Sequence, residues 1–75
     1  MLSEAQYNLL APYKNDIISR SMEKAKNYLL IANTIQQQLG MGSICFSCDG
    51  DKIAAMDNMY NLFKEYEQTN GIVTL

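Results

Sequence analysis

The Cys-x-x-Cys motif at Cys45 and Cys48 is the one motif in this sequence with chemical content. Its spacing allows two thiolates to bind one zinc ion, or two thiols to close a redox disulfide. A structural zinc site needs four ligands, and the chain has no histidine. One chain therefore supplies half a site, unless Asp49 or Asp51 joins it or two chains share the ion.

A redox role would place the first thiol at a helix N-terminus in a βαβ setting, and the sequence lacks the strands for it. Free cysteine is among the most buried residue types, and a reducing cytosol keeps thiols reduced. We therefore expect Cys45 and Cys48 to be thiols that pack the loop against helices. The prediction is no metal and no cofactor, with a zinc-linked dimer through this pair as an alternative.

Other catalytic groups are scarce. Without histidine, the chain lacks the side chain most often used for proton transfer near neutral pH. Ser19 and Ser21 fall within a predicted helix with no base nearby, so a serine nucleophile is not supported. The acids Asp49, Asp51 and Asp57 do not fit the register of a calcium loop. We expect no enzymatic activity and no small-molecule substrate.

Composition describes an ordinary globular chain. Its 75 residues are 48% hydrophobic and 19% charged, which predicts one domain over 1–75. Eight acids and six bases give a formal charge of −2 without a basic cluster, so neither nucleic acid nor a membrane surface is an expected partner. The first six residues have no basic or apolar segment typical of a secretory signal, which predicts an intracellular site of synthesis.

Hydrophobic spacing predicts an all-α fold. Ser3 and Gln6 form a capping box that starts a short helix over 4–11, and Pro12 interrupts it. A long amphipathic helix is predicted over 13–39, because apolar or small residues recur every three or four positions: Tyr13, Ile17, Ser21, Ala25, Tyr28, Ala32, Ile35 and Leu39.

A glycine-rich loop over 40–51 carries the cysteine pair and leads into a second helix over 52–69, capped by Asp49 or Asp51. Asn70-Gly71 ends that helix and leaves an apolar tail, 72–75. The predicted architecture is an antiparallel helical hairpin with a short N-terminal helix.

The predicted long helix has a consequence for binding. It would extend about 40 Å, whereas a compact chain of this size is about 29 Å across. Part of its apolar stripe would then need cover from another chain, and the tail adds apolar surface. The predicted interface residues are Tyr13, Ile17, Ile35, Leu39, Ile72, Val73 and Leu75.

Two helices flanking a loop that contains Cys45-Phe46-Ser47-Cys48, after a capped segment ending near Pro12, resemble small helical proteins of tailed bacteriophages. The resemblance covers residues 3–69 and carries over no binding residue. It implies a virion part such as a connector, ring or capsid accessory protein, or an early protein that binds a host factor.

Together these observations predict a small acidic protein that acts through protein–protein contact. The leading hypothesis is a structural or assembly subunit of a phage-like particle, located in the virion or the bacterial host cytoplasm. A small inhibitor that binds a host protein is the alternative. Self-association would favour the first hypothesis, and a stable monomer with one partner would favour the second.

Overall fold

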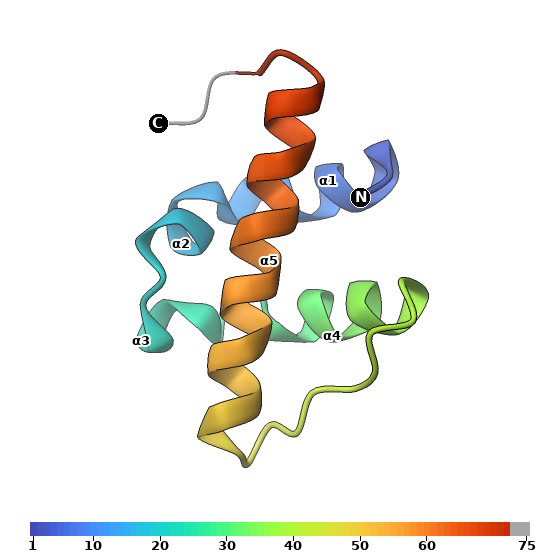
Figure 1. Cartoon of the computed structure of the whole chain (residues 1–75). Helices are drawn as coiled ribbons and strands as arrows, with labels where there is room; N and C mark the ends of the chain where they lie inside the picture. The colour runs from blue at the N-terminus through green and yellow to red at the C-terminus, as the bar shows by residue number, and fades with distance from the viewer. Residues whose placement is uncertain (73–75) are drawn as a thin grey trace.

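The computed structural model describes residues 1–72, and this part of the chain is helical without strands (Figure 1). The predicted all-α class is confirmed. The elements are α1 (Glu4–Leu10), a 3-10 turn η1 (Ala11–Tyr13), α2 (Lys14–Ser19), α3 (Met22–Ala25), α4 (Leu29–Gln38) and α5 (Asp49–Thr69).

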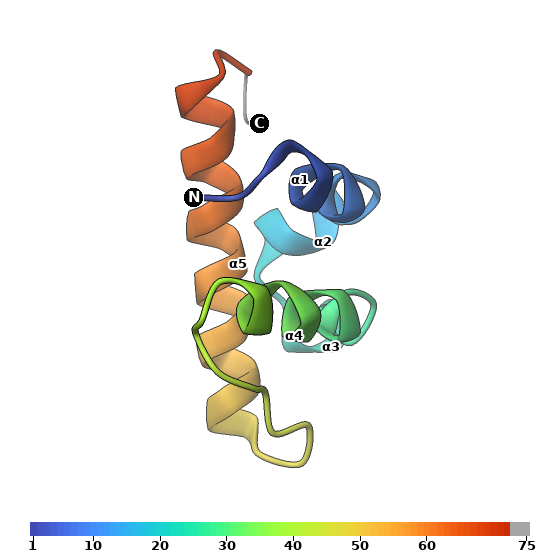
Figure 2. The same cartoon turned by 90° about the vertical axis from the view of Figure 1, so that its right-hand side faces the viewer.

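The helices form two layers. Figure 2 shows α5 alone on one side, with the segments from α1 to α4 packed against its other side. Among the described helices, none is long and apolar enough to span a bilayer. Helix α5 forms one layer, and the four shorter helices form the other.

The N-terminal helix begins as the sequence predicts. The Gln6 N–H donates to Ser3 Oγ at 3.1 Å, and the Ser3 N–H donates to Gln6 Oε1 at 2.9 Å, which completes the capping box. The helix ends at Leu10 and tightens into η1, which contains Pro12. Proline has no N–H to continue the α-helical hydrogen bonds, so the chain changes its helical form here.

The predicted continuous helix over 13–39 is wrong. The chain breaks first at Arg20, whose backbone is left-handed with φ 53° and ψ 36°, and continues through an extended Ser21. A second break precedes α4, where Tyr28 has φ −127° and ψ 2°. Serine and asparagine near these breaks favour turns and caps because their side chains compete for backbone hydrogen bonds.

Packing against α5 explains the breaks. Ile17, Ala25 and Ile35 are each 0% exposed, although they belong to three separate helices, and Tyr28 in the turn before α4 is also 0% exposed. A straight helix would carry part of this stripe beyond the domain, whereas the folded-back chain brings all of it onto one core. A left-handed residue costs about 1–2 kcal/mol, and burial of several apolar side chains exceeds that cost.

The predicted antiparallel hairpin is also absent. Figure 1 shows α4 crossing α5 instead of running alongside it, with the segment 39–48 connecting the two. The end of α4 is closed by two backbone bonds, from Met41 N–H to the Gln36 carbonyl at 2.8 Å and from Gly40 N–H to the Gln37 carbonyl at 3.1 Å. Gly40 has φ 74°, the left-handed conformation that this cap requires.

Helix α5 begins at Asp49, earlier than the predicted start at 52, and its end at Thr69 coincides with the predicted end. Gly71, with φ 71°, repeats the closure seen at α4, because the Ile72 N–H donates to the Glu67 carbonyl at 2.8 Å. The core lies between α5 and the other layer. Its buried apolar residues are Leu2, Leu10, Ile17, Ala25, Tyr28, Leu29, Ala32, Ile35, Ile44, Ala55, Met56, Met59 and Phe63.

Candidate functional site

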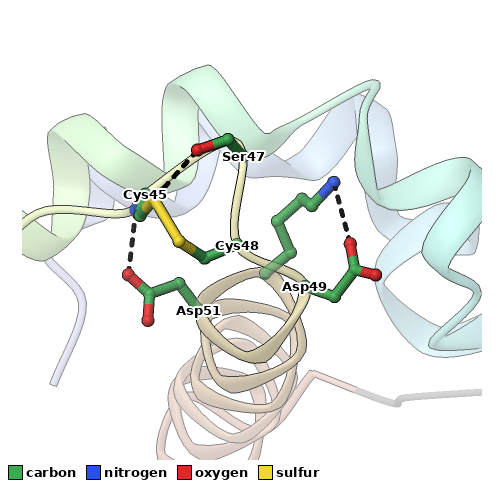
Figure 3. The surroundings of a disulfide bond; sticks show 6 residues. Cys45, Ser47, Cys48, Asp49 and Asp51 are labelled. Carbon is green, nitrogen blue, oxygen red and sulfur yellow. Dashed lines mark hydrogen bonds and ion pairs between the residues drawn. A yellow bond between two sulfur atoms is a disulfide. The ribbon is translucent and has the colours of Figure 1, made fainter.

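A disulfide joins Cys45 to Cys48 in the segment before α5 (Figure 3). Their Cα atoms are 5.3 Å apart, within the usual range for a disulfide. Cys45 is half-buried and Cys48 is exposed. The prediction of two thiols that pack against the helices is therefore wrong, because the cysteines pair with each other at the surface and neither belongs to the core cluster.

Backbone bonds hold the disulfide segment between α4 and α5. Ile44 is buried, and its N–H donates to Asn33 Oδ1 of α4 at 2.9 Å. The Cys45 N–H donates to Asp51 Oδ2 of α5 at 3.0 Å, and the Cys48 N–H donates to the Cys45 carbonyl at 3.1 Å. The four-residue ring is thus bonded to α5 at Cys45, and the preceding residue, Ile44, is bonded to α4.

The first turn of α5 is acidic. Cys48 is the N-cap residue, with an extended backbone and no side-chain cap bond, so neither Asp49 nor Asp51 caps the helix as predicted. Asp51 instead accepts from the Cys45 N–H, and Asp49 pairs with Lys52 at 3.4 Å. Both carboxylates interact favourably with the positive end of the helix dipole.

The Ser47 side chain contacts the disulfide. Its Oγ lies 3.3 Å from Cys45 Sγ (Figure 3). A disulfide sulfur carries no proton, so the serine hydroxyl is the donor in this contact. Ser47 is exposed, as is Phe46 beside it.

The zinc-linked dimer stays a prediction, and it would first require reduction of the disulfide. The two sulfur atoms are bonded to each other and present no thiolates, the form that binds zinc. Within residues 1–72, no group of three or more cysteine, aspartate or glutamate residues lies close enough to hold a metal ion.

A small hollow lies beside the disulfide segment. Its volume is about 170 Å³, and its lining includes Gln36, Ser43, Ile44, Asp51 and Asn58. Gln36 is buried, and its Oε1 accepts from Asn58 Nδ2 at 3.3 Å. The hollow is small and polar, and Asp51 is the acid in its lining.

A second polar cluster lies inside the helical layers, although the sequence pattern indicates a solvated acidic face for Glu67. Glu67 is 0% exposed and accepts from the Tyr7 hydroxyl at 2.6 Å, with Lys14 Nζ 3.1 Å from the same carboxylate. Burial raises the pKa of Tyr7 to about 12, helped by the hydrogen bond to Glu67 and by the charge of that carboxylate. The cluster joins α1 and α2 to α5, and we assign it a structural role.

Two predicted interface residues belong to the core. Ile17 and Ile35 are each 0% exposed, so they offer no surface to a partner in this fold. The prediction failed because it assumed an overhanging helix, and the break at Arg20 folds the stripe back over α5.

The other predicted interface residues differ in how far they are exposed. Tyr13 and Leu39 are partly buried against the core, whereas Ile72 is 39% exposed. Val73 and Leu75 lie outside the described residues. Prominent exposure occurs instead at residues that were not predicted as contacts, namely Leu9, Leu30, Phe46 and Ile53, together with Met1, Met22 and Met41.

Comparison with known proteins found no match to a family model, a curated sequence or a solved structure.

Proposed function

We propose that this protein is a non-enzymatic assembly subunit that associates with further copies of itself, and that Phe46 is an anchor of the contact. The observation that carries the proposal is the exposure of this aromatic side chain, 44%, at the surface of a ring closed by a disulfide. The resemblance to small helical bacteriophage proteins supports a place in a phage-like particle.

The geometry around Phe46 suits an interface anchor. Aromatic side chains supply much of the binding energy at protein interfaces, because they bury a large area at a low entropy cost. The ring between Cys45 and Cys48 restricts the backbone of Phe46, and the bond from the Cys45 N–H to Asp51 holds that ring on α5. Such ordering before binding reduces the entropy lost on association.

The size and charge of the chain are compatible with self-association. A chain of 75 residues builds only a small core, and natural proteins of this size often gain stability from disulfides or oligomerisation. A formal charge of −2 gives little repulsion between copies. Exposed Leu30 and Ile53 add apolar surface that a second copy can cover.

Sedimentation velocity over a hundredfold concentration range tests the proposal. The unmodified chain should shift from monomer to a defined larger species, and Phe46→Ala should move that transition to at least about tenfold higher concentration, the loss of about 1.4 kcal/mol. Leu9→Ala is the matched control, because Leu9 is similarly exposed at 53% but belongs to α1.

Equal effects of the two substitutions would contradict the role of Phe46. A monomer at every concentration would contradict self-association and favour the alternative, an inhibitor that binds one host protein.

A further inference from the structure

We propose that Cys45 and Cys48 form a reversible thiol–disulfide exchange site whose reactant is an external thiol, with Cys48 as the sulfur that is attacked. The inference applies to the dissociated chain, in which Phe46 and Cys48 are both exposed, so it does not rest on the contact proposed for Phe46. It rests on the accessibility of the bond, its position in the fold and the side chain beside it.

Access favours attack at Cys48. Cys48 is exposed, whereas Cys45 is half-buried and its backbone is bonded to Asp51. Figure 3 shows the two sulfur atoms in the segment just before α5. Exchange requires an approaching thiolate to reach one sulfur in line with the bond, so exposure selects between the two sulfurs.

Reduction of the disulfide takes place as two successive displacements. An external thiolate attacks Cys48 Sγ, which forms a mixed disulfide and releases Cys45 as a thiolate. A second external thiolate then attacks the external sulfur of the mixed disulfide and releases Cys48 as a thiolate. Two external thiolates lose two electrons and become one disulfide, while Cys45 and Cys48 are reduced and take up protons from water.

Ser47 is placed to assist the first displacement. Its hydroxyl is 3.3 Å from Cys45 Sγ, the leaving sulfur. A hydrogen bond to a developing thiolate is stronger than one to a neutral sulfur, because the acceptor is charged. Loss of this donor should therefore slow reduction without altering the core.

The second displacement leaves negative charge on Cys48. This residue is the N-cap of α5, a helix of 21 residues, and its side chain is at the positive end of the helix dipole. Asp49 and Asp51 oppose that effect, although the ion pair of Asp49 with Lys52 at 3.4 Å offsets part of the charge.

The contacts that hold this segment on the core do not involve the disulfide. Neither cysteine is part of the core cluster, and Ile44 remains attached to Asn33 by its N–H. Helix α5 also keeps the bond from Lys52 N–H to the Cys48 carbonyl at 3.2 Å. Reduction and reoxidation can therefore cycle in the folded protein, as an exchange site requires.

The rate of reduction in the folded chain is the first test. The full chain is treated with reduced glutathione or dithiothreitol, quenched with N-ethylmaleimide at intervals, and measured by mass spectrometry. We expect the folded-state rate to lie within about tenfold of the rate in denaturant, since access controls exchange. A greater slowing with both thiols would overturn the proposal and identify a protected structural disulfide.

Glutathione, a monothiol, and dithiothreitol, a dithiol, should differ in whether the mixed disulfide accumulates. A mixed disulfide should accumulate transiently with glutathione and not with dithiothreitol, which resolves its own mixed disulfide. In the unmodified chain the trapped intermediate should carry glutathione on Cys48 and N-ethylmaleimide on Cys45, mapped by peptide mass, and the reverse pattern would overturn the assignment of the attacked sulfur.

Single variants test the roles of the residues. Cys48 in Cys45→Ser should react with oxidised glutathione about tenfold faster than Cys45 in Cys48→Ser, because it is the more accessible thiol. Ser47→Ala should slow glutathione reduction of the unmodified pair about threefold or more, through loss of a hydrogen bond to the leaving sulfur. An unchanged rate would overturn the role of Ser47.

Ser43→Ala is the control for Ser47→Ala. Ser43 is an exposed serine of the same segment, and its Oγ accepts from Gln37 Nε2 at 3.3 Å, away from the disulfide chemistry. Circular dichroism should be the same for both variants, so a slower reduction specific to Ser47→Ala reports on the displacement and not on unfolding.

Discussion

The Tyr7 hydroxyl donates a 2.6 Å hydrogen bond to the Glu67 carboxylate across a sequence separation of 60 residues. The ring of Tyr7 also stacks on Tyr66 and Phe63, with centroid distances of 4.3 and 4.8 Å. One residue of α1 therefore makes both a polar and an aromatic connection to α5. Lys14 Nζ, 3.1 Å from the same carboxylate, adds α2 to this connection.

Tyr7→Phe should lower the free energy of unfolding by about 1–3 kcal/mol, because it removes a donor from a buried carboxylate while keeping the stacked ring. Urea denaturation followed by circular dichroism measures this change. Tyr66→Phe is the matched control, since it keeps the ring that stacks on Tyr7, and it should cost no more than about 0.5 kcal/mol. Equal costs would contradict the special role of the Tyr7 hydroxyl.

Tyr28→Phe should behave in the opposite way. Tyr28 is 0% exposed, and its hydroxyl is buried without a hydrogen-bond partner within the described residues. Removing an unsatisfied buried hydroxyl should leave stability unchanged or raise it by about 1 kcal/mol. The same urea experiment decides the sign, and a loss above about 1 kcal/mol would show that the hydroxyl has a partner, such as an internal water.

Alkaline pH should destabilise the fold. Burial is the main cause that raises the pKa of both Tyr7 and Tyr28 from 10.0 to about 12. In this range the unfolded chain releases these protons first, so the native state binds more protons and stability falls as pH rises from 10 towards 12. Below pH 10 this contribution is fully present.

Urea midpoints measured between pH 8 and 11.5 give the pH dependence. The double variant Tyr7→Phe/Tyr28→Phe should show a shallower decline above pH 10 than the unmodified chain, because it lacks both titrating hydroxyls. Identical slopes for the two proteins would mean that other groups control alkaline unfolding.

Arg20 provides a test of the break between α2 and α3. Its left-handed backbone favours glycine, so Arg20→Gly should be more stable than Arg20→Ala by about 1 kcal/mol. Both variants lose the ion pair with Asp57 and the contact with the Tyr60 ring at 5.1 Å, so their difference isolates the backbone. Thermal denaturation of the pair gives the order, and greater stability of the alanine variant would indicate a continuous helix at this position.

Periodicity in the sequence identified the part of the core that lies between α2 and α4. Ile17, Ala25, Tyr28, Ala32 and Ile35 were placed on one apolar stripe, and all five are 0% exposed. The local signals were equally reliable where a few neighbouring residues determine the conformation. The capping box at the start of α1 and the glycine closures after α4 and α5 depend on bonds within one turn, so the sequence alone predicted their positions.

The sequence did not predict the helix breaks, because the three- and four-residue spacing of the stripe is the same in one straight helix and in three short ones. The single residue Arg20 adopts a conformation that its own propensity disfavours, and packing of the stripe on α5 stabilises it. The interface prediction is wrong for Ile17 and Ile35 for this reason, because the folded-back chain buries both residues.

The sequence determined by itself that the chain is helical, which side chains are apolar on its inner face, and that two cysteines stand before the last long helix. Tertiary structure alone decided that Tyr7 meets Glu67, and that Cys45 and Cys48 lie at the surface as a disulfide beside Ser47. The physical reason is the distance along the chain over which each interaction acts. Capping and periodicity act over a single turn, whereas burial, charge pairing and exposure depend on where the whole chain places each side chain.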